Sequence, residues 1–304
     1  MSAIIIRLSG GLGNQMFQYA TGRALALRDQ SLLFVDLEAY KTYKLHKYSL
    51  HHFPLQLDML AGYDSRHFRK QPKWFDPVLL KLGRSKVPQE LLKSAVQVIS
   101  EPTFRYQSGI LQLTPPLYLD GYWQSPKYFE EISDILRKEF QVKTPANQIN
   151  LDMADQIQSG ASVSLHIRRA DYFANSKTQS IHGLCSLAYY KTAVAYLSER
   201  HDNLKFYIFS DDIPWAKENL NFEIEKTFID FNDPEKNYED LRLMSYCHHH
   251  IIANSTFSWW GAWLGNPDGI TISPDRWFQD ESKGPPVDDL LPTEWIRIKD
   301  EARC

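Results

Sequence analysis

The chain has 304 residues, of which 43% are hydrophobic and 23% are charged, and its formal net charge is -3. This length and apolar content are sufficient for two globular domains of ordinary size, each with its own core. A chain with this charge has no polycationic surface for a phosphate backbone, so we expect no nucleic-acid partner.

Cysteine content and hydropathy indicate where the protein works. The three cysteines, Cys185, Cys247 and Cys304, are scattered, which is typical of a reducing compartment rather than of a secreted disulfide framework. The apolar run near the N-terminus is too short for a signal peptide, and no stretch of about 20 apolar residues follows it. We therefore expect a cytoplasmic protein, with at most peripheral membrane association.

The first half of the chain begins with a strand, a helix and a second strand. AIIIRL predicts a buried strand, GGLGNQ a loop, the residues from about Gln15 to Arg28 a helix, and SLLFVDLEAY the second strand. Between Lys41 and Pro116 the pattern predicts only short helices and the strand AVQVIS. PLYLDGYW then predicts a strand, and SPKYFEEISDILRKEF predicts one capped amphipathic helix.

The second half alternates more regularly. Five strands are predicted, at SVSLHIRR, KFYIFSDD, FEIEKTFID, HHIIANS and GITISP, and the clearest helices between them are LAYYKTAVAYLSERH and YEDLRLMSYC. Such alternation is typical of an open parallel α/β sheet. The polar segment VKTPANQIN is the predicted boundary, which divides the chain into domains 1–148 and 149–304.

Polar clusters follow three of the second-half strands: HIRRAD, FSDD and ANSTFS. Ligands of open parallel sheets bind at the carboxyl ends of the strands, so we expect these clusters to form one site. Arg168 and Arg169 are successive strand residues whose side chains face opposite sides, so one can pair with a carboxylate while the other faces a ligand such as a diphosphate. A surface ion pair with Asp171 or another acid is the more common meaning of an isolated Arg-Arg-x-Asp sequence.

The other two clusters have alternative interpretations. Asn254, Ser255 and Thr256 are good N-cap residues, and the helix that they begin is either an anion site or simply a capped core helix. For Asp211 and Asp212 we rank a helix cap first, contacts to a nucleotide second and a divalent metal third. The triplet of histidines at 248–250 lacks the helical spacing of metal ligands, so structural histidines are favoured there.

The segment GGLGNQMF follows the first strand, as a dinucleotide-binding fingerprint does, and Asp36 lies at the distance of a ribose-binding acid. Met16 occupies the position of the third glycine, which weakens close packing of the helix on the strand. A NAD-dependent oxidoreductase is therefore an alternative function, supported only by an incomplete dinucleotide-binding fingerprint.

Taken together and in this order, GGLGNQMFQYA, HIRRADY, YIFSDD and ANSTFSWWGAWL resemble the bacterial α-1,2-fucosyltransferases, over nearly the whole chain. The HxRRxD motif recurs in related α-1,6- and protein O-fucosyltransferases. Ala170 stands where the family usually has glycine. The resemblance implies an α/β fold of the GT-B type, with two Rossmann-like domains facing across a cleft: an N-terminal acceptor-side domain and a C-terminal domain that holds GDP-fucose. It implies no metal and no cofactor beyond the donor substrate.

The resemblance also implies roles for individual residues. Arg168 would contact the donor diphosphate and stabilise departing GDP, Arg169 would buttress the site, and Asp171 is the candidate general base. His166 and one of the two aspartates would hold guanosine. The complete donor-binding set is His166, Arg168, Arg169, Asp211, Asp212, Asn254, Ser255, Thr256, Phe257 and Ser258. The N-terminal loop residues near fucose and the acceptor are Gly11, Gly13, Asn14 and Gln15.

The implied activity is inverting transfer of L-fucose from GDP-L-fucose to the 2-hydroxyl of a terminal galactose. The acceptor would be an oligosaccharide or a lipid-linked glycan, in bacterial surface polysaccharide (O-antigen) synthesis. Negative charge builds on the diphosphate in such a transfer, so a fixed cation there lowers the barrier. Besides the oxidoreductase, a non-catalytic nucleotide-sugar- or glycan-binding protein of the same fold is the alternative.

Overall fold

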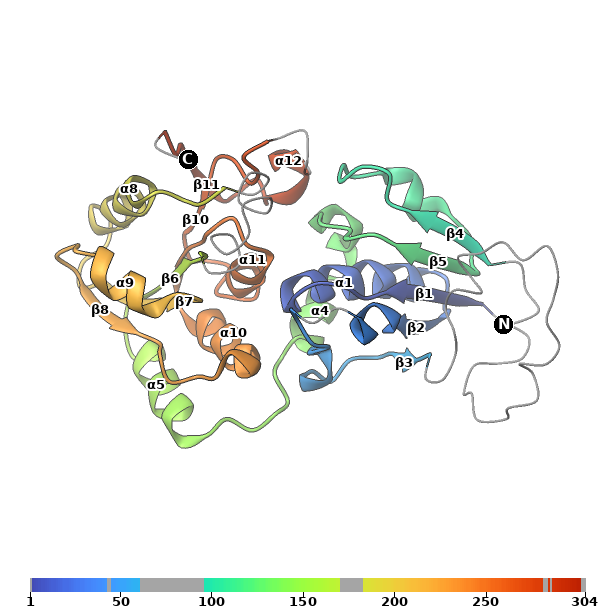
Figure 1. Cartoon of the computed structure of the whole chain (residues 1–304), viewed down its shortest axis with the longest axis horizontal. Helices are drawn as coiled ribbons and strands as arrows, with labels where there is room; N and C mark the ends of the chain where they lie inside the picture. Colours follow the sequence, from blue (N-terminus) through green and yellow to red (C-terminus); the bar gives the residue numbers. More distant parts are fainter. Residues whose placement is uncertain are drawn as a thin grey trace. The chain divides into compact units, whose positions relative to one another are not determined.

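The protein is described by a computed structural model that covers residues 2–42, 45–60, 96–169, 183–280, 284 and 286–301. The chain divides into two compact units, Met1–Glu139 and Phe140–Cys304, each built on its own sheet (Figure 1). The predicted division after residue 148 lies inside the second unit, where helix α5 (Gln148–Gln158) begins. The acceptor and donor roles assigned to the two halves stay predictions.

Unit 1 contains a five-stranded parallel sheet of order β3-β2-β1-β5-β4. Its strands are β1 (Ala3–Arg7), β2 (Leu32–Asp36), β3 (Asp58–Met59), β4 (Gln97–Ser100) and β5 (Leu117–Asp120). Ile4, Ile5 and Ile6 of the central strand are all fully buried, because a parallel strand covered on both faces needs a continuous apolar run rather than an alternating one. The sequence therefore predicts this strand well.

Two helix predictions in unit 1 need correction. Helix α1 (Leu12–Arg28) begins at Leu12, so the last four of the six residues in the predicted loop GGLGNQ are helical. Gly10, at a φ of 78°, turns the chain in a conformation that favours glycine, and the extended Gly11 then serves as the N-cap. The single helix predicted from Ser125 is also wrong, because Phe129, at a φ of -137°, interrupts it.

Among the described residues of unit 1, the helical segments are therefore the long helix α1 and several short ones. Only α4 (Ser133–Glu139) of the predicted amphipathic helix is α-helical. The 3-10 turns are η1 (Glu38–Lys41), η2 (Leu50–His52), η4 (Ser108–Gln112), η5 (Pro126–Tyr128) and η6 (Glu130–Ile132).

Unit 2 contains a six-stranded parallel sheet of order β11-β10-β9-β6-β7-β8. Its strands are β6 (Ser162–Ile167), β7 (Lys205–Ser210), β8 (Glu225–Phe228), β9 (His249–Ile251), β10 (Thr271–Pro274) and β11 (Ile296–Ile298). The first five were predicted. Strand β11 was missed because its Ile-Arg-Ile pattern is too short to be distinguished from a loop.

Helices cover both faces of this second sheet. They are α5, α8 (Leu187–Ser198), α9 (Ile213–Asn219), α10 (Asn237–Tyr246), α11 (Thr256–Trp263) and α12 (Val287–Leu290), with one 3-10 turn, η7 (Pro234–Lys236). Val163, Leu165 and Ile167 of β6 pack with buried residues of α8 and α9, while Tyr207 and Phe209 of β7 pack with residues of α5 and α10. The predicted open parallel α/β sheet is confirmed.

The order of strands in unit 2 reverses direction next to β6. The chain proceeds from β6 through β7 to β8 on one side, and then resumes with β9 on the other side of β6. The reversal leaves a switch point between β6 and β9, where open α/β sheets bind ligands beyond the carboxyl ends of their strands.

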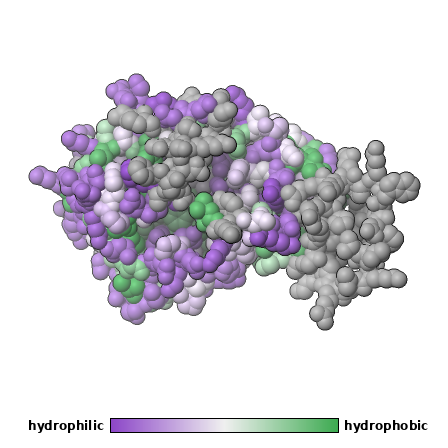
Figure 2. All heavy atoms as spheres, in the orientation of Figure 1, coloured by the Kyte–Doolittle hydropathy of each residue, from purple (hydrophilic) through white to green (hydrophobic). Residues whose placement is uncertain are grey.

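In the part of the chain that the structure describes, no helix has the length and apolar character needed to cross a membrane. On the face seen in Figure 2, hydrophobic residues occur in small groups among hydrophilic ones.

Candidate functional site

The three polar clusters predicted from the sequence meet at one edge of the unit 2 sheet. Strand β6 pairs with β7 up to Ile167 opposite Ser210, and with β9 up to Leu165 opposite Ile251. All three strands are parallel, so their carboxyl ends meet at the same edge. The segments HIRR, FSDD and ANSTFS therefore begin side by side, at the switch point.

Both arginines of the HIRR segment pair with an acid at this edge. Arg168 Nη1 lies 3.1 Å from Asp211 Oδ2, and Arg169 Nε lies 3.8 Å from Asp212 Oδ2. The expectation that one arginine pairs while the other faces a ligand is therefore too simple. The Arg169 guanidinium also lies 3.8 Å from the centroid of the Trp215 ring, a cation–π distance that fixes its plane.

The two aspartates of FSDD make hydrogen bonds and ion pairs within the chain. Asp212 Oδ1 accepts a hydrogen bond from the Trp215 N–H at 3.2 Å and caps α9, which confirms the interpretation ranked first. Asp211 Oδ1 accepts from the Arg169 N–H at 2.8 Å while its other oxygen faces Arg168. A contact of either aspartate with guanosine stays a prediction.

His166 is a buried ring with an unused nitrogen. It is 3% exposed, its ring centroid lies 5.7 Å from that of Phe257, and its Nδ1 has no hydrogen-bond partner among the described residues. Burial, with a smaller contribution from the Arg168 charge, lowers the pKa of His166 to about 3. The ring is therefore neutral at physiological pH and can offer a hydrogen bond to a bound molecule.

The start of α11 lies across the switch point from the β6 tip. Asn254 is 1% exposed, and its Nδ2 donates to the carbonyls of Gly183 (3.2 Å) and Trp277 (3.0 Å). The Ser258 hydroxyl donates to the Ala253 carbonyl at 3.3 Å. These side chains thus shape the loop.

Further along this segment, Ser255 is the N-cap of α11 and makes no side-chain capping bond, while Thr256 and Phe257 are half-buried. The backbone N–H groups of the first turn of a helix point beyond its N-terminus, which favours an anion there. Asp171, the predicted base, and Ala170 lie outside the described residues, so the assignment of the base stays a prediction.

The predicted loop residues of unit 1 are mostly engaged within the unit. Gln15 is fully buried; its Nε2 donates to the Gly10 carbonyl at 3.1 Å, and its Oε1 accepts from the Ser49 N–H at 2.9 Å. Asn14 Oδ1 accepts from Gln124 Nε2 at 3.0 Å. Gly11 faces a histidine ring, and Gly13 is buried in α1. Gln15 therefore has a structural role that the sequence pattern did not reveal.

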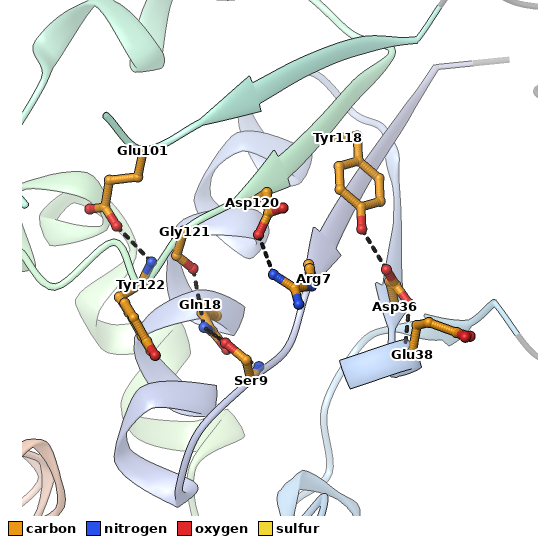
Figure 3. Close-up of polar contacts among 10 residues, drawn as sticks. All are labelled: Arg7, Ser9, Gln18, Asp36, Glu38, Glu101, Tyr118, Asp120, Gly121 and Tyr122. Atoms are coloured by element: carbon orange, nitrogen blue, oxygen red, sulfur yellow. Dashed lines mark hydrogen bonds and ion pairs between the residues drawn. The ribbon is translucent and has the colours of Figure 1, made fainter. Parts of the chain in front are cut away.

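Asp36 does not have the environment of a ribose-binding acid. It is 3% exposed; its Oδ1 accepts from the Glu38 N–H at 2.8 Å and its Oδ2 from the Tyr118 hydroxyl (Figure 3). Both carboxylate oxygens of Asp36 accept hydrogen bonds inside unit 1. The oxidoreductase alternative therefore loses its ribose-binding acid.

The histidine triplet is structural, as predicted. His249 Nδ1 accepts from the Ile270 N–H at 2.9 Å, and His250 Nδ1 bonds to the Ser164 hydroxyl at 2.8 Å. Burial, assisted by the neighbouring histidines, lowers the pKa of His249 to about 4 and that of His250 to about 3. Within the described ranges, no group of three or more His, Cys, Asp or Glu residues could hold a metal ion.

Sequence reasoning overlooked Asp240, in the first turn of α10. Because α10 connects β8 to β9, that turn lies at the same carboxyl edge as the other clusters. Asn232 Nδ2 donates to its carboxylate at 2.8 Å, and burial raises the pKa of Asp240 to about 7. An acid within the apolar helix pattern YEDLRLM was the available signal, because buried carboxylates with a perturbed pKa gather at functional sites.

Comparison with known proteins decides the family. The model of glycosyl transferase family 11 matches residues 89–299. This chain belongs to glycosyl transferase family 11. The resemblance recognised in the motifs is thereby confirmed.

Relatives of this family 11 chain include an Escherichia coli alpha-1,2-colitosyltransferase, 41% identical over 98% of this chain and 100% of that protein. The O-antigen biosynthesis glycosyltransferase WbnK of Escherichia coli is 29% identical over 96% and 99% of the two chains. The human galactoside alpha-(1,2)-fucosyltransferase 1 is 26% identical over 60% of this chain and 53% of its own length.

Among solved structures, a mutant of Arabidopsis thaliana FUT1 in complex with GDP superposes with a TM-score of 0.54 at 10% identity, covering 100% of this chain and 78% of that one. At this identity the likeness concerns the fold alone. The predicted α/β fold of the GT-B class, with a parallel sheet in each unit, is confirmed.

Proposed function

We propose that this family 11 chain transfers L-fucose from GDP-L-fucose to the 2-hydroxyl of a terminal galactose, with inversion, to form an α-1,2 linkage. The observation that carries the proposal is that β6, which ends just before Arg168, and β9, which leads into α11, are neighbouring parallel strands whose carboxyl ends adjoin at the switch point of the unit 2 sheet. This edge combines a fixed guanidinium with helix N–H groups, which is the equipment needed to hold a diphosphate.

The proposed reaction needs charge stabilisation more than covalent chemistry. The acceptor oxygen bonds to C1 of the sugar, the bond from C1 to the phosphate oxygen breaks, and its electron pair leaves with GDP. Arg168 and the α11 N-terminus stabilise the charge that develops on the leaving diphosphate. Arg169, held by Asp212 and the Trp215 ring, supports the end of β6 next to Arg168. The proton of the 2-hydroxyl passes to a base, for which Asp171 is our candidate.

The nucleoside would lie against the buried groups at the same edge. His166 offers a neutral ring, and Asp240 offers a carboxylate whose pKa burial raises to about 7. Guanine presents N–H donors and a carbonyl acceptor to such groups, and burial makes each hydrogen bond more discriminating than it would be in water. Metal-independence remains part of the proposal.

Colitose is the second candidate for the transferred sugar, because an alpha-1,2-colitosyltransferase is 41% identical over nearly the whole chain. Colitose is L-fucose without its 3-hydroxyl. A site that hydrogen-bonds this hydroxyl rejects the deoxy analogue strongly, whereas an apolar site discriminates weakly against the extra hydroxyl. Comparing turnover of GDP-fucose with turnover of GDP-colitose therefore tests whether the site hydrogen-bonds the 3-hydroxyl of the sugar.

The experiment incubates the purified chain with GDP-fucose or GDP-colitose and a β-galactoside, measures GDP release, and determines the product linkage by NMR. An α-1,2-fucosyl product supports the proposal. Faster turnover of GDP-colitose would replace the donor and keep the reaction class. GDP release from neither donor, in a protein that binds GDP, would favour the non-catalytic alternative. The O-antigen setting is proposed together with this activity, in line with the name of the WbnK relative.

A further inference from the structure

The turn Gly121–Trp123 follows β5 in unit 1 as the segment ANSTFS follows β9 in unit 2, since β5 and β9 each lie beside the first strand of their sheet. The chain runs from β1 through β2 to β3 on one side of the sheet, while β5 pairs with β1 on the other side. The unit 1 sheet therefore has its own switch point, between β1 and β5. The turn follows β5 directly, at the carboxyl edge where ligands of such sheets bind (Figure 3).

This turn is strained and firmly held. Trp123 is a fully buried residue at a φ of 55°, a left-handed conformation that is rare for a bulky side chain. The Glu101 carboxylate accepts from the N–H groups of Tyr122 (2.7 Å) and Trp123 (3.2 Å), while Gln18 Nε2 donates to the Gly121 carbonyl at 3.1 Å. Strain of this kind persists only where the surroundings impose it, and it is typical of ligand clamps.

Close packing adds a second constraint on the turn. A Cβ atom on Gly121 would lie 2.5 Å from the Glu101 Cβ and 2.9 Å from the Trp123 ring, so only glycine fits here. The indole Nε1 of Trp123 is buried and has no hydrogen-bond partner among the described residues. Hydrogen bonds and close packing thus both fix the conformation of the turn, and the Trp123 Nε1–H donates to no described residue.

The turn leaves the Tyr122 ring half-exposed rather than in the core. The ring stacks on Phe104, with centroids 5.9 Å apart and planes 27° apart, and in Figure 3 its side chain points away from Glu101. If the turn served only to pack the core, the partly exposed Tyr122 would be the residue that least needs a fixed backbone. Instead, the carboxylate of Glu101 fixes the backbone at Tyr122 itself.

Polar side chains stand two residues before and two residues after Tyr122 in the chain. Asp120, the last residue of β5, pairs with Arg7 at 2.7 Å and keeps 25% of its side chain exposed. On the segment after the turn, Gln124 Nε2 donates to Asn14 Oδ1 of α1 at 3.0 Å. A pyranose has C–H groups on one face and hydroxyls around its rim. A half-exposed aromatic ring, on a segment that also carries a carboxylate and an amide, is complementary to that pattern.

We propose that the Tyr122 ring, backed by Phe104, is the platform on which the terminal galactose of the acceptor lies. This inference rests on the proposed function, because that function makes the acceptor a galactoside. The strained turn holds the ring in its stacking position before the acceptor arrives, which reduces the ordering that binding requires.

The test compares Tyr122→Leu, which removes the aromatic face, with Tyr122→Phe, which keeps it. With donor at saturation, we expect the KM for the galactoside acceptor to rise roughly tenfold in Tyr122→Leu and to stay within about twofold in Tyr122→Phe. The Kd for GDP should be unchanged in both. Tyr246→Leu, which alters a tyrosine 40% exposed at the end of α10, is the matched control and should leave the acceptor KM unchanged.

A folded Tyr122→Leu protein with the acceptor KM of the wild type would overturn the platform. If that variant does not fold, Phe104→Leu replaces it, and the acceptor KM should rise several-fold because the ring loses its backing. If the wild type transfers no sugar to any galactoside, the proposed function fails separately. Saturation-transfer NMR with a β-galactoside then decides: binding that is lost in Tyr122→Leu supports the platform, and equal binding or no binding in the wild type refutes it.

Discussion

Removing the Arg168 guanidinium should cost most of the turnover. Arg168→Ala deletes the cation at the tip of β6, where the departing diphosphate gains charge. Two unit charges about 4 Å apart interact by about 4 kcal/mol at the effective dielectric of a partly exposed site. Arg168 is 21% exposed and already faces Asp211 at 3.1 Å, so part of this interaction is offset. We expect a loss of about 2.7–4 kcal/mol, or roughly 100- to 1,000-fold in kcat.

The structure adds a second perturbation that can be separated from the first. Without Arg168, the Asp211 carboxylate stands unneutralised beside the proposed phosphate position and repels it. Asp211→Asn introduced into Arg168→Ala should therefore recover roughly threefold to tenfold of the lost rate. Arg168→Lys should fall between wild type and alanine, because an ammonium is a point charge and cannot contact Asp211 and a phosphate as a planar fork does.

The assay is GDP release under saturating acceptor, with the unfolding midpoint and circular dichroism of each variant as the check on folding. Arg200→Ala is the matched control: its guanidinium also lies over an aromatic ring, at 3.6 Å from the Tyr196 centroid, but at the far end of α8. It should leave kcat unchanged. A folded Arg168→Ala enzyme that keeps turnover within about threefold of wild type would refute the placement of the donor diphosphate.

Two further predictions concern the stability of unit 2. The pKa of His250 is about 3 in the folded protein and about 6.5 in the unfolded chain. Between pH 3 and pH 6.5 the imidazole is therefore protonated only in the unfolded chain, so the free energy of unfolding falls as the pH drops below about 6.5. At pH 5 this proton uptake lowers the free energy of unfolding by about 2 kcal/mol. In His250→Gln, the loss of unfolding free energy between pH 7.5 and pH 5, measured by urea titration, should therefore be smaller than in the wild type by about that amount. An unchanged pH dependence in this variant would contradict the assignment. Gly269→Ala should destabilise the protein by about 3 kcal/mol or more, because its Cβ would lie 1.7 Å from the His248 carbonyl oxygen. Gly160→Ala, with nothing within 4 Å of the new Cβ, should change stability by less than about 1 kcal/mol, and equal effects of the two substitutions in thermal unfolding would refute the packing argument.

Local pattern was sufficient where burial repeats along a strand or helix. Burial is continuous along β6 and along Ala3–Ile6 of β1 because parallel strands are covered on both faces. The Ser186 cap marks the start of α8, and apolar periods mark both α8 and α10. The pattern failed where the chain changes conformation within a single amphipathic stretch, as at Phe129 between η5 and η6. It also failed for β11, whose stability comes from pairing with β10 rather than from its own three residues.

For the site, the sequence by itself supplied the residue types and their order along the chain: arginines after one strand, aspartates after the next and a capped helix after another, which together also point to the family. The partners of those residues were decided only by tertiary structure. Pairing of Arg168 with Asp211 joins positions 43 residues apart, and the burial that leaves Asp240 with a pKa of about 7 comes from packing around α10. Hydrogen bonds and desolvation depend on which groups meet in space, so roles such as that of Glu101 beneath the Tyr122 turn follow from the folded sheet and not from any local pattern.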